Sequence, residues 1–142
     1  KNKVHFVTAD EKELGKRMLL NFGHTFAHAI EAASNFSKKI NHGEAVLLGI
    51  LAASKFSNRE NLLPKSELKL IENHLLELKY DNLKSYFRKN NINKILNYMI
   101  KDKKNNNKDI NLILLKKISK PVLNKRYSQI KLKKFLSSLI DK

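Results

Sequence analysis

The sequence predicts a mostly α-helical domain with one small β element. Apolar residues recur three or four positions apart through several segments, and polar loops separate these segments. A later segment, 110–118, is instead a short apolar run with β-branched residues, which is typical of a strand. At 142 residues the chain is long enough for one domain with its own core, so we expect residues 1–142 to form a single domain. In chain order we expect an extended lead-in at 3–8, helices at 18–33, 41–58, 66–78 and 92–100, a β element near residues 110–123, and a closing helix at 132–140.

The first two helices have recognisable starts. A polar, acidic segment at 9–17 precedes the helix at 18–33, as is common at helix starts. The next helix is expected to begin at Asn41, a candidate N-cap, with Glu44 three residues later as in a capping box. Its sequence is then apolar nearly all round, so we expect this helix to be buried until residues 61–64, NLLP, end it.

The later elements follow from spacing and from breaking residues. Leu68, Ile71 and Leu75 have helical spacing within the third helix, and a short fourth helix follows. The polar run 101–109 is expected to be a loop before the strand. Pro121 is expected to stop that strand, because proline cannot donate a hydrogen bond to a ladder.

The charge and composition restrict the class of protein. The net charge is +16, but lysine and asparagine rise together in segments such as DKKNNNKDIN, which favours a compositional bias over a nucleic-acid partner. The chain has no cysteine, which excludes a disulfide framework and a thiolate metal site. Its longest apolar run, 45–53, is too short for a membrane span, which needs about 20 residues. The N-terminus does not have the pattern of a secretory signal, so we expect a cytoplasmic protein without a membrane partner. Because the sequence has no initiating methionine, we consider it a fragment or a processed product.

A polar stripe without lysine marks the first helix. Arg17, Asn21, His24, His28 and Glu31 are spaced four, three, four and three apart, which places them within about 80° of a helix surface. This chain places lysine on most of its polar segments, yet no lysine occurs between Arg17 and Lys38. We therefore expect the stripe to face protein or a ligand cleft rather than bulk water.

Histidines in this region are candidate metal ligands. His24 and His28 lie four apart on one helix face, which suits one shared metal, or one metal and one substrate, or two structural histidines. His42 lies in the first turn of the next helix, where the helix dipole disfavours imidazolium. A zinc site would need a further donor, and the chemistry alone leaves three candidates, Glu13, Glu31 and Glu44. For Glu44 we prefer a capping role only.

Four motifs together resemble 3-dehydroquinate synthase. They are LLNFGHTFAHAIEA at 19–32, HGEAVLLGI at 42–50, the upstream KVHFVTADEKELGKRMLLN, and the downstream MIKDKKNNNKDINLILL. The resemblance covers nearly the whole chain, in order. It implies conversion of the sugar phosphate 3-deoxy-D-arabino-heptulosonate 7-phosphate to 3-dehydroquinate with release of phosphate, a step of the shikimate pathway.

The resemblance also implies the cofactors and the domain organisation. The family uses NAD⁺ catalytically and a divalent metal, Zn²⁺ or Co²⁺. It combines an N-terminal α/β domain that binds NAD⁺ with a helical C-terminal domain that carries most metal and substrate groups. This chain resembles the second domain, so the NAD-binding domain is expected as its partner, in a homodimer. We expect the chain alone not to turn over.

Site residues follow from the same motifs. The resemblance implies His24 and His42 as metal ligands, and His28 as a histidine that assists proton transfer near the substrate phosphate. Further catalytic and substrate-binding positions match Lys3, Glu13, Arg17, Asn21 and Lys103. A glutamate outside this chain would be the third metal ligand.

The sequence departs from the family pattern in two places. Ala27 stands where glycine is common, and we expect the extra methyl group to be tolerated. Lys108 and Asn111 replace a glycine and an arginine after the DKK motif.

Other functions have weaker support. A sibling sugar-phosphate cyclase and an iron-dependent alcohol dehydrogenase would share the paired histidines, but the dehydrogenases lack the Arg17 and Asn21 pair and the DKK motif. A basic nucleic-acid binder would place lysine on the helix face that here has none. An inactive relic is disfavoured because the whole set of site residues is present.

Overall fold

The computed structural model describes residues 22–33, 41–79, 92–101, 109–118 and 120–140. Its elements, in chain order, are α3 (His24–Ala33), α4 (His42–Arg59), α5 (Lys65–Glu77), α6 (Ile92–Lys101), β1 (Asp109–Lys117), β2 (Lys120–Ser128) and α7 (Gln129–Ile140). This mostly helical composition with one small sheet confirms the predicted fold class. None of the helices in these ranges is both long and apolar enough to cross a membrane.

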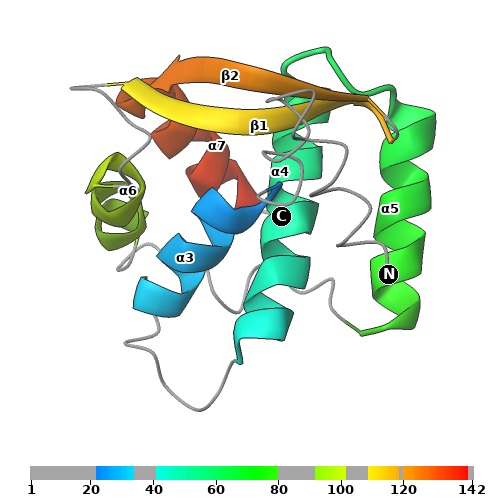
Figure 1. The fold of residues 1–142 in the computed structure, drawn as a ribbon, viewed down its shortest axis with the longest axis horizontal. Coiled ribbons are helices and arrows are strands. Elements are labelled where there is room, and N and C mark those ends of the chain that lie inside the picture. Colours follow the sequence, from blue (N-terminus) through cyan, green and yellow to red (C-terminus); the bar gives the residue numbers. More distant parts are fainter. Residues whose placement is uncertain (1–21, 34–40, 80–91, 102–108, 119, 141–142) are drawn as a thin grey trace, which may run out of the picture.

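The helices α3 and α4 pack together at the centre of the fold. Figure 1 shows the hairpin of β1 and β2 lying across one end of the helices, with α5 and α6 on opposite flanks. One continuous core cluster joins α3 and α4 to α6, β1 and α7. Its largest fully buried side chains include Phe26, Ile30, Phe56, Ile95 and Leu136. The core therefore fixes α3 against α4, and these two helices carry the candidate site.

The start of α4 has the capping box that the sequence predicts. Asn41 is the N-cap, and its side-chain oxygen accepts a hydrogen bond from the backbone N–H of Glu44 at 2.8 Å. The Glu44 carboxylate accepts one from the backbone N–H of Asn41 at 3.0 Å, which completes the capping box. The helix ends at Arg59, before the predicted NLLP break, and half of its residues are buried. The predicted capping role of Glu44 is confirmed.

The prediction of one continuous helix over 18–33 is wrong at residues 22–23. Phe22 and Gly23 form a turn, and α3 begins at His24. Gly23 has a φ of +81°, a left-handed conformation that glycine adopts without steric cost but that interrupts a right-handed helix. Arg17 and Asn21, which were predicted to share a helix face with the histidines, lie outside the described residues.

The β element is larger than predicted. β1 pairs with β2 in an antiparallel hairpin that continues to Ser128, beyond the expected limit at residue 123. Pro121 does not stop the structure but lies inside β2, opposite Leu115. Pro121 is the second residue of β2 and borders a register irregularity between Leu115 and Lys117, and strand starts and bulges are places where a sheet tolerates proline. The prediction that Pro121 stops the strand is therefore wrong.

The remaining helices match the sequence closely. α5 and α6 agree with the predicted ranges to within one residue. α7 begins at Gln129, three residues before the predicted start, directly after β2. The hydroxyl of Ser128 accepts a hydrogen bond from the backbone N–H of Lys131 at 3.2 Å and so caps this early first turn.

Tyr127, near the end of β2, packs its ring against that of Phe56. Burial raises the pKa of the Tyr127 hydroxyl, and the nearby carboxylate of Glu60 raises it further.

Candidate active site

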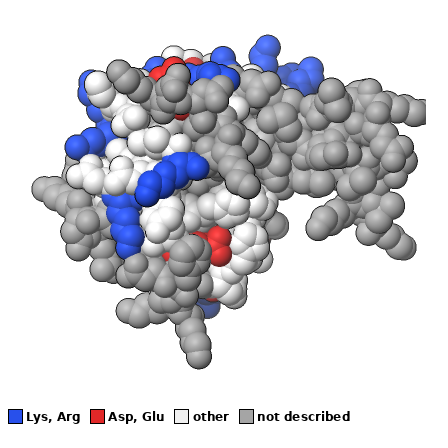
Figure 2. Space-filling view, turned by 60° about the vertical axis from the view of Figure 1, so that its left-hand side comes forward, with Lys and Arg blue, Asp and Glu red and all other residues white. Residues whose placement is uncertain are grey.

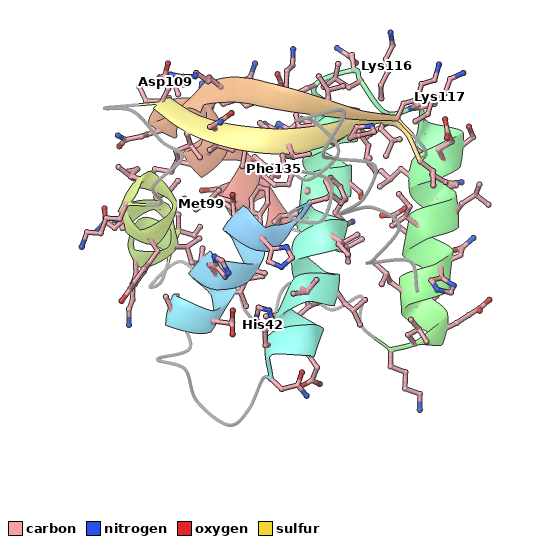
Figure 3. The ribbon with its side chains drawn as sticks, viewed as in Figure 1. His42, Met99, Asp109, Lys116, Lys117 and Phe135 are labelled. Atoms are coloured by element: carbon pink, nitrogen blue, oxygen red, sulfur yellow. The ribbon has the colours of Figure 1, made fainter. Side chains whose placement is uncertain are left out.

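Three histidines from two helices come together in one cluster, which we call the histidine cluster (His24, His28 and His42). The ring centroids of His24 and His28, one turn apart on α3, are 5.7 Å from each other. His42, from α4, lies 5.9 Å from His24 and 6.2 Å from His28. Figure 3 shows His42 at the start of α4, on the side toward α3. The fold therefore brings His42 next to two histidines that lie 14 and 18 residues before it in sequence.

Small residues let α3 and α4 approach closely enough to form this cluster. A Cβ atom added to Gly23 would lie 2.8 Å from the backbone nitrogen of Ile50. One added to Gly49 would lie 2.9 Å from the backbone nitrogen and 3.1 Å from the Cβ of Ala27. Ala27 is fully buried. Its methyl group, which replaces the glycine common in the family pattern, packs against Gly49, which has no side chain.

The side chain of His42 is in hydrogen-bonding contact with a carboxylate, that of Glu31. The Nδ1 atom of His42 lies 3.1 Å from Oε1 of Glu31, on the last turns of α3. Only 17% of the Glu31 side chain is exposed, compared with 60% of the His42 side chain. The sequence analysis named Glu31 only as one of three candidates for a further metal donor and did not predict its pairing with His42. The signal was available in the stripe that Glu31 shares with His24 and His28.

The donor set of the histidine cluster fits a zinc-type metal in part. Two imidazole nitrogens about 2.1 Å from one zinc ion, at a tetrahedral angle, hold their ring centroids about 5 to 6 Å apart. The separations of 5.9 Å between His24 and His42 and of 5.7 Å between His24 and His28 both agree with this range. Within the described ranges, however, no three or more His, Cys, Asp or Glu side chains are arranged to hold a metal ion by themselves. The arrangement supports two histidine ligands and leaves any further donor outside these ranges.

The other predicted site residues cannot be placed relative to the cluster. They lie outside the described part of the chain: Lys3, Glu13, Arg17, Asn21 and Lys103. Of the two departures after the DKK motif, Lys108 also lies outside it. Asn111 lies in β1, opposite Arg126, so it belongs to the sheet and not to a loop.

Lysine and arginine are spread over several elements of the part of the chain that the structure describes. Figure 2 shows Lys and Arg of the described residues in separate groups over the face that it presents. The exposed cations of the described residues include Lys116 and Lys117 on the hairpin and Lys133 and Lys134 on α7. This distribution agrees with lysine as a general surface residue of the chain.

Comparison with known proteins decides the family. The family model described as 3-dehydroquinate synthase C-terminal matches residues 1–105. The chain belongs to the 3-dehydroquinate synthase family. It is 48% identical to the 3-dehydroquinate synthase of Pelagibacter ubique over 141 residues, which are 99% of this chain and 38% of that protein. It is 40% identical to the enzyme of Coxiella burnetii over 138 residues, 96% of this chain and 37% of the relative. The chain thus spans somewhat over a third of the length of the curated relatives it matches.

Two solved structures have a similar fold. A 2-deoxy-scyllo-inosose synthase complexed with carbaglucose-6-phosphate, NAD⁺ and Co²⁺ superposes with a TM-score of 0.70 at 27% identity. The match covers 85% of this chain and 35% of that one. A 2-epi-5-epi-valiolone synthase from Streptomyces hygroscopicus, with NAD⁺ and Zn²⁺ bound, has a TM-score of 0.76 at 21% identity, over 98% of this chain and 37% of its own. This second likeness shows the fold alone.

Proposed function

We propose that this chain is the metal- and substrate-binding part of a 3-dehydroquinate synthase. The substrate would be 3-deoxy-D-arabino-heptulosonate 7-phosphate, and the products 3-dehydroquinate and inorganic phosphate. The observation that carries the proposal is the histidine cluster, built by α3 and α4 in a chain of this family. The 48% identity over 99% of the chain supports the same activity over that of a sibling cyclase.

His24 and His42 are the proposed metal ligands, and His28 is the proposed substrate-side histidine. When bound, a divalent metal such as Zn²⁺ or Co²⁺ supplies a Lewis acid for the hydroxyl being oxidised, and NAD⁺ supplies a hydride acceptor. The related synthase crystallised with NAD⁺ and Co²⁺ supports this pair of cofactors. His28 is exposed, while its ring lies 5.7 Å from that of His24. It is therefore accessible to a substrate beside the metal site, where an imidazole can move a proton near the leaving phosphate.

The anionic substrate requires counter-charges that the sequence supplies. By their motif positions, Lys3, Arg17 and Lys103 are the proposed cations for the substrate carboxylate and phosphate. Asn21 is the proposed hydrogen-bonding partner of a substrate hydroxyl, and Glu13 the proposed acid–base group. These roles rest on the resemblance of the motifs.

The proposed enzyme also needs groups beyond this chain. The relatives are more than twice as long as the matched segment. We propose that an NAD-binding domain supplies the dinucleotide site and the third metal ligand, and that the enzyme works as a cytoplasmic homodimer. The chain alone is expected to have no turnover.

Phosphate release tests the proposal. The full-length protein, with NAD⁺ and Zn²⁺, is expected to release phosphate from 3-deoxy-D-arabino-heptulosonate 7-phosphate and to form 3-dehydroquinate. A His24→Ala variant is expected to lose more than about 100-fold of this activity, because a metal ligand matters at least as much as a residue that supports one. The control is His74→Ala, which changes an exposed histidine on α5, outside the cluster. Release of phosphate by the His24→Ala variant at the normal rate would contradict the metal assignment.

A second substrate distinguishes the sibling activity. Glucose 6-phosphate should not be turned over by the full-length protein. Turnover of glucose 6-phosphate without turnover of the heptulosonate phosphate would contradict the proposed activity. It would instead indicate an activity like that of the 2-deoxy-scyllo-inosose synthase crystallised with carbaglucose-6-phosphate.

A further inference from the structure

The contact between Glu31 and His42 joins the two helices beside the histidine cluster. Nδ1 of His42, the first residue of α4, lies 3.1 Å from Oε1 of Glu31 on α3. The carboxylate is the more buried partner, with 17% of its side chain exposed. A largely buried carboxylate is held in place by its surroundings, whereas an exposed imidazole turns freely unless a partner fixes it. Glu31 is therefore placed to orient His42.

The chemistry of the pair sets the tautomer of the ring. An ionised carboxylate only accepts hydrogen bonds, so Nδ1 of His42 must carry the proton and donate it. In a neutral imidazole the lone pair then lies on Nε2. A metal ligand needs that free lone pair, and a carboxylate on the other ring nitrogen also makes it more basic.

Other carboxylates near His42 do not offer this contact. Glu44 lies two residues after His42, but its carboxylate is engaged in the capping box with the backbone of Asn41. The rings of His24 and His28 stand 5.9 and 6.2 Å from that of His42, so the cluster supplies neighbours for the ring but no carboxylate. Among the residues that the structure describes, Glu31 is the side chain recorded in a hydrogen bond with His42.

We propose that Glu31 is a positioning residue, which holds His42 as the Nδ1–H tautomer and thereby directs Nε2 to the metal. This inference rests on the proposed function, because it takes His42 as a ligand. Glu31 acts through His42 and does not itself bind the metal or the substrate. The negative charge and the hydrogen-bond acceptor of Glu31 both serve this role, so the acceptor alone is expected to retain part of it.

Two substitutions separate positioning from direct ligation. Glu31→Ala removes the acceptor, while Glu31→Gln keeps an oxygen that accepts from Nδ1–H but is a poor zinc ligand. Zn²⁺ affinity of the full-length protein, measured by competition with a chromophoric chelator, is expected to fall about 10- to 100-fold in Glu31→Ala and clearly less in Glu31→Gln. Glu77→Ala, at an exposed position on α5, is the control and should bind zinc as the wild type does.

A second measurement needs no metal. In the metal-free protein, ¹⁵N chemical shifts of the His42 ring should show the Nδ1–H tautomer in the wild type and in Glu31→Gln, and a mixture of tautomers in Glu31→Ala. A purely structural role would not move these shifts. Unfolding midpoints of the metal-free variants identify any general loss of stability.

The outcomes distinguish this inference from the proposed function. If the wild type binds no zinc, the proposed function fails. If the wild type binds zinc and Glu31→Ala binds it equally well, only the positioning role is overturned. If Glu31→Gln is as weak as Glu31→Ala, Glu31 is a direct ligand and the positioning role is again overturned.

Discussion

At the scale of single residues, the spacing of the histidine cluster depends on two glycines. Gly23 and Gly49 face each other where α3 crosses α4, and a methyl group on Gly49 would meet the carbonyl oxygen of Gly23. His24 follows Gly23 directly, so the position of this crossing also sets the position of the first histidine. The distance between the metal-ligand candidates is thus fixed by backbone contact.

Gly49→Ala tests this dependence. The added Cβ would lie 2.9 Å from the backbone nitrogen of Ala27, so α3 must shift away from α4. Overpacking of this kind costs about 1–3 kcal/mol in the free energy of unfolding, and the shift should also weaken Zn²⁺ binding by separating His24 from His42. Urea denaturation and a zinc titration of the full-length protein measure the two effects.

The matched control is Gly43→Ala in the same helix. A Cβ at Gly43 would meet only the Asn41 side-chain oxygen, at 3.5 Å, which is an ordinary contact. Alanine is favoured over glycine in a helix by about 1 kcal/mol, so this variant should be as stable as the wild type or more stable. Equal stability of Gly49→Ala and Gly43→Ala would show that the crossing is not tightly packed.

At the scale of elements, a buried serine links α4 to the hairpin. The hydroxyl of Ser57 donates to the carbonyl of Ala53 at 2.7 Å and accepts from the backbone N–H of Leu115 at 2.9 Å. Ser57 is fully buried, so Leu115 has no water to replace this bond. The link holds β1 on the side of α4 and so supports one end of the core.

Ser57→Ala should therefore cost about 1–3 kcal/mol in the free energy of unfolding, because a buried N–H group loses its acceptor. Ser54→Ala is the matched control, since Ser54 is equally buried but bonds only the carbonyl of Ile50 in its own helix. Its cost should be smaller. Chemical denaturation of both variants gives the comparison, and a cost at position 54 equal to that at 57 would remove the case for the link.

The sequence predicted most elements because their signals are local. The Asn41 and Glu44 cap and the apolar spacing of α5 and α6 each lie within a few neighbouring residues, and all three were confirmed. The signals that failed depend on tertiary context. Pro121 is tolerated in β2 beside a register irregularity of the hairpin, and the left-handed Gly23 lies where the backbone of α4 passes close to it.

At the scale of the whole molecule, the histidine cluster was predictable only in part. The spacing of His24 and His28 placed them on one helix face, and the structure confirms that they are neighbours. The approach of His42 depends on a helix crossing that no local pattern reports, although its place in the first turn of the next helix had already made it a candidate metal ligand. The partnership of Glu31 with His42 depends on the same crossing and was missed.

Because α3 and α4 cross at the histidine cluster, we predict that a bound metal ion stabilises the fold. His24 begins α3 and His42 begins α4, so one ion bound to both would tie the two central helices together. A ligand that binds only the folded state raises the free energy of unfolding by about 2.7 kcal/mol at a concentration 100 times its Kd. Removing metal from the full-length protein with a chelator should therefore lower the unfolding midpoint, and adding Zn²⁺ should restore it.

The His42→Ala variant should lose this response to Zn²⁺, because it removes a group that joins α4 to the ion. The control variant His74→Ala should keep the response. A midpoint that is the same with chelator and with Zn²⁺ would mean that the ion does not bridge these helices, whatever the activity of the enzyme.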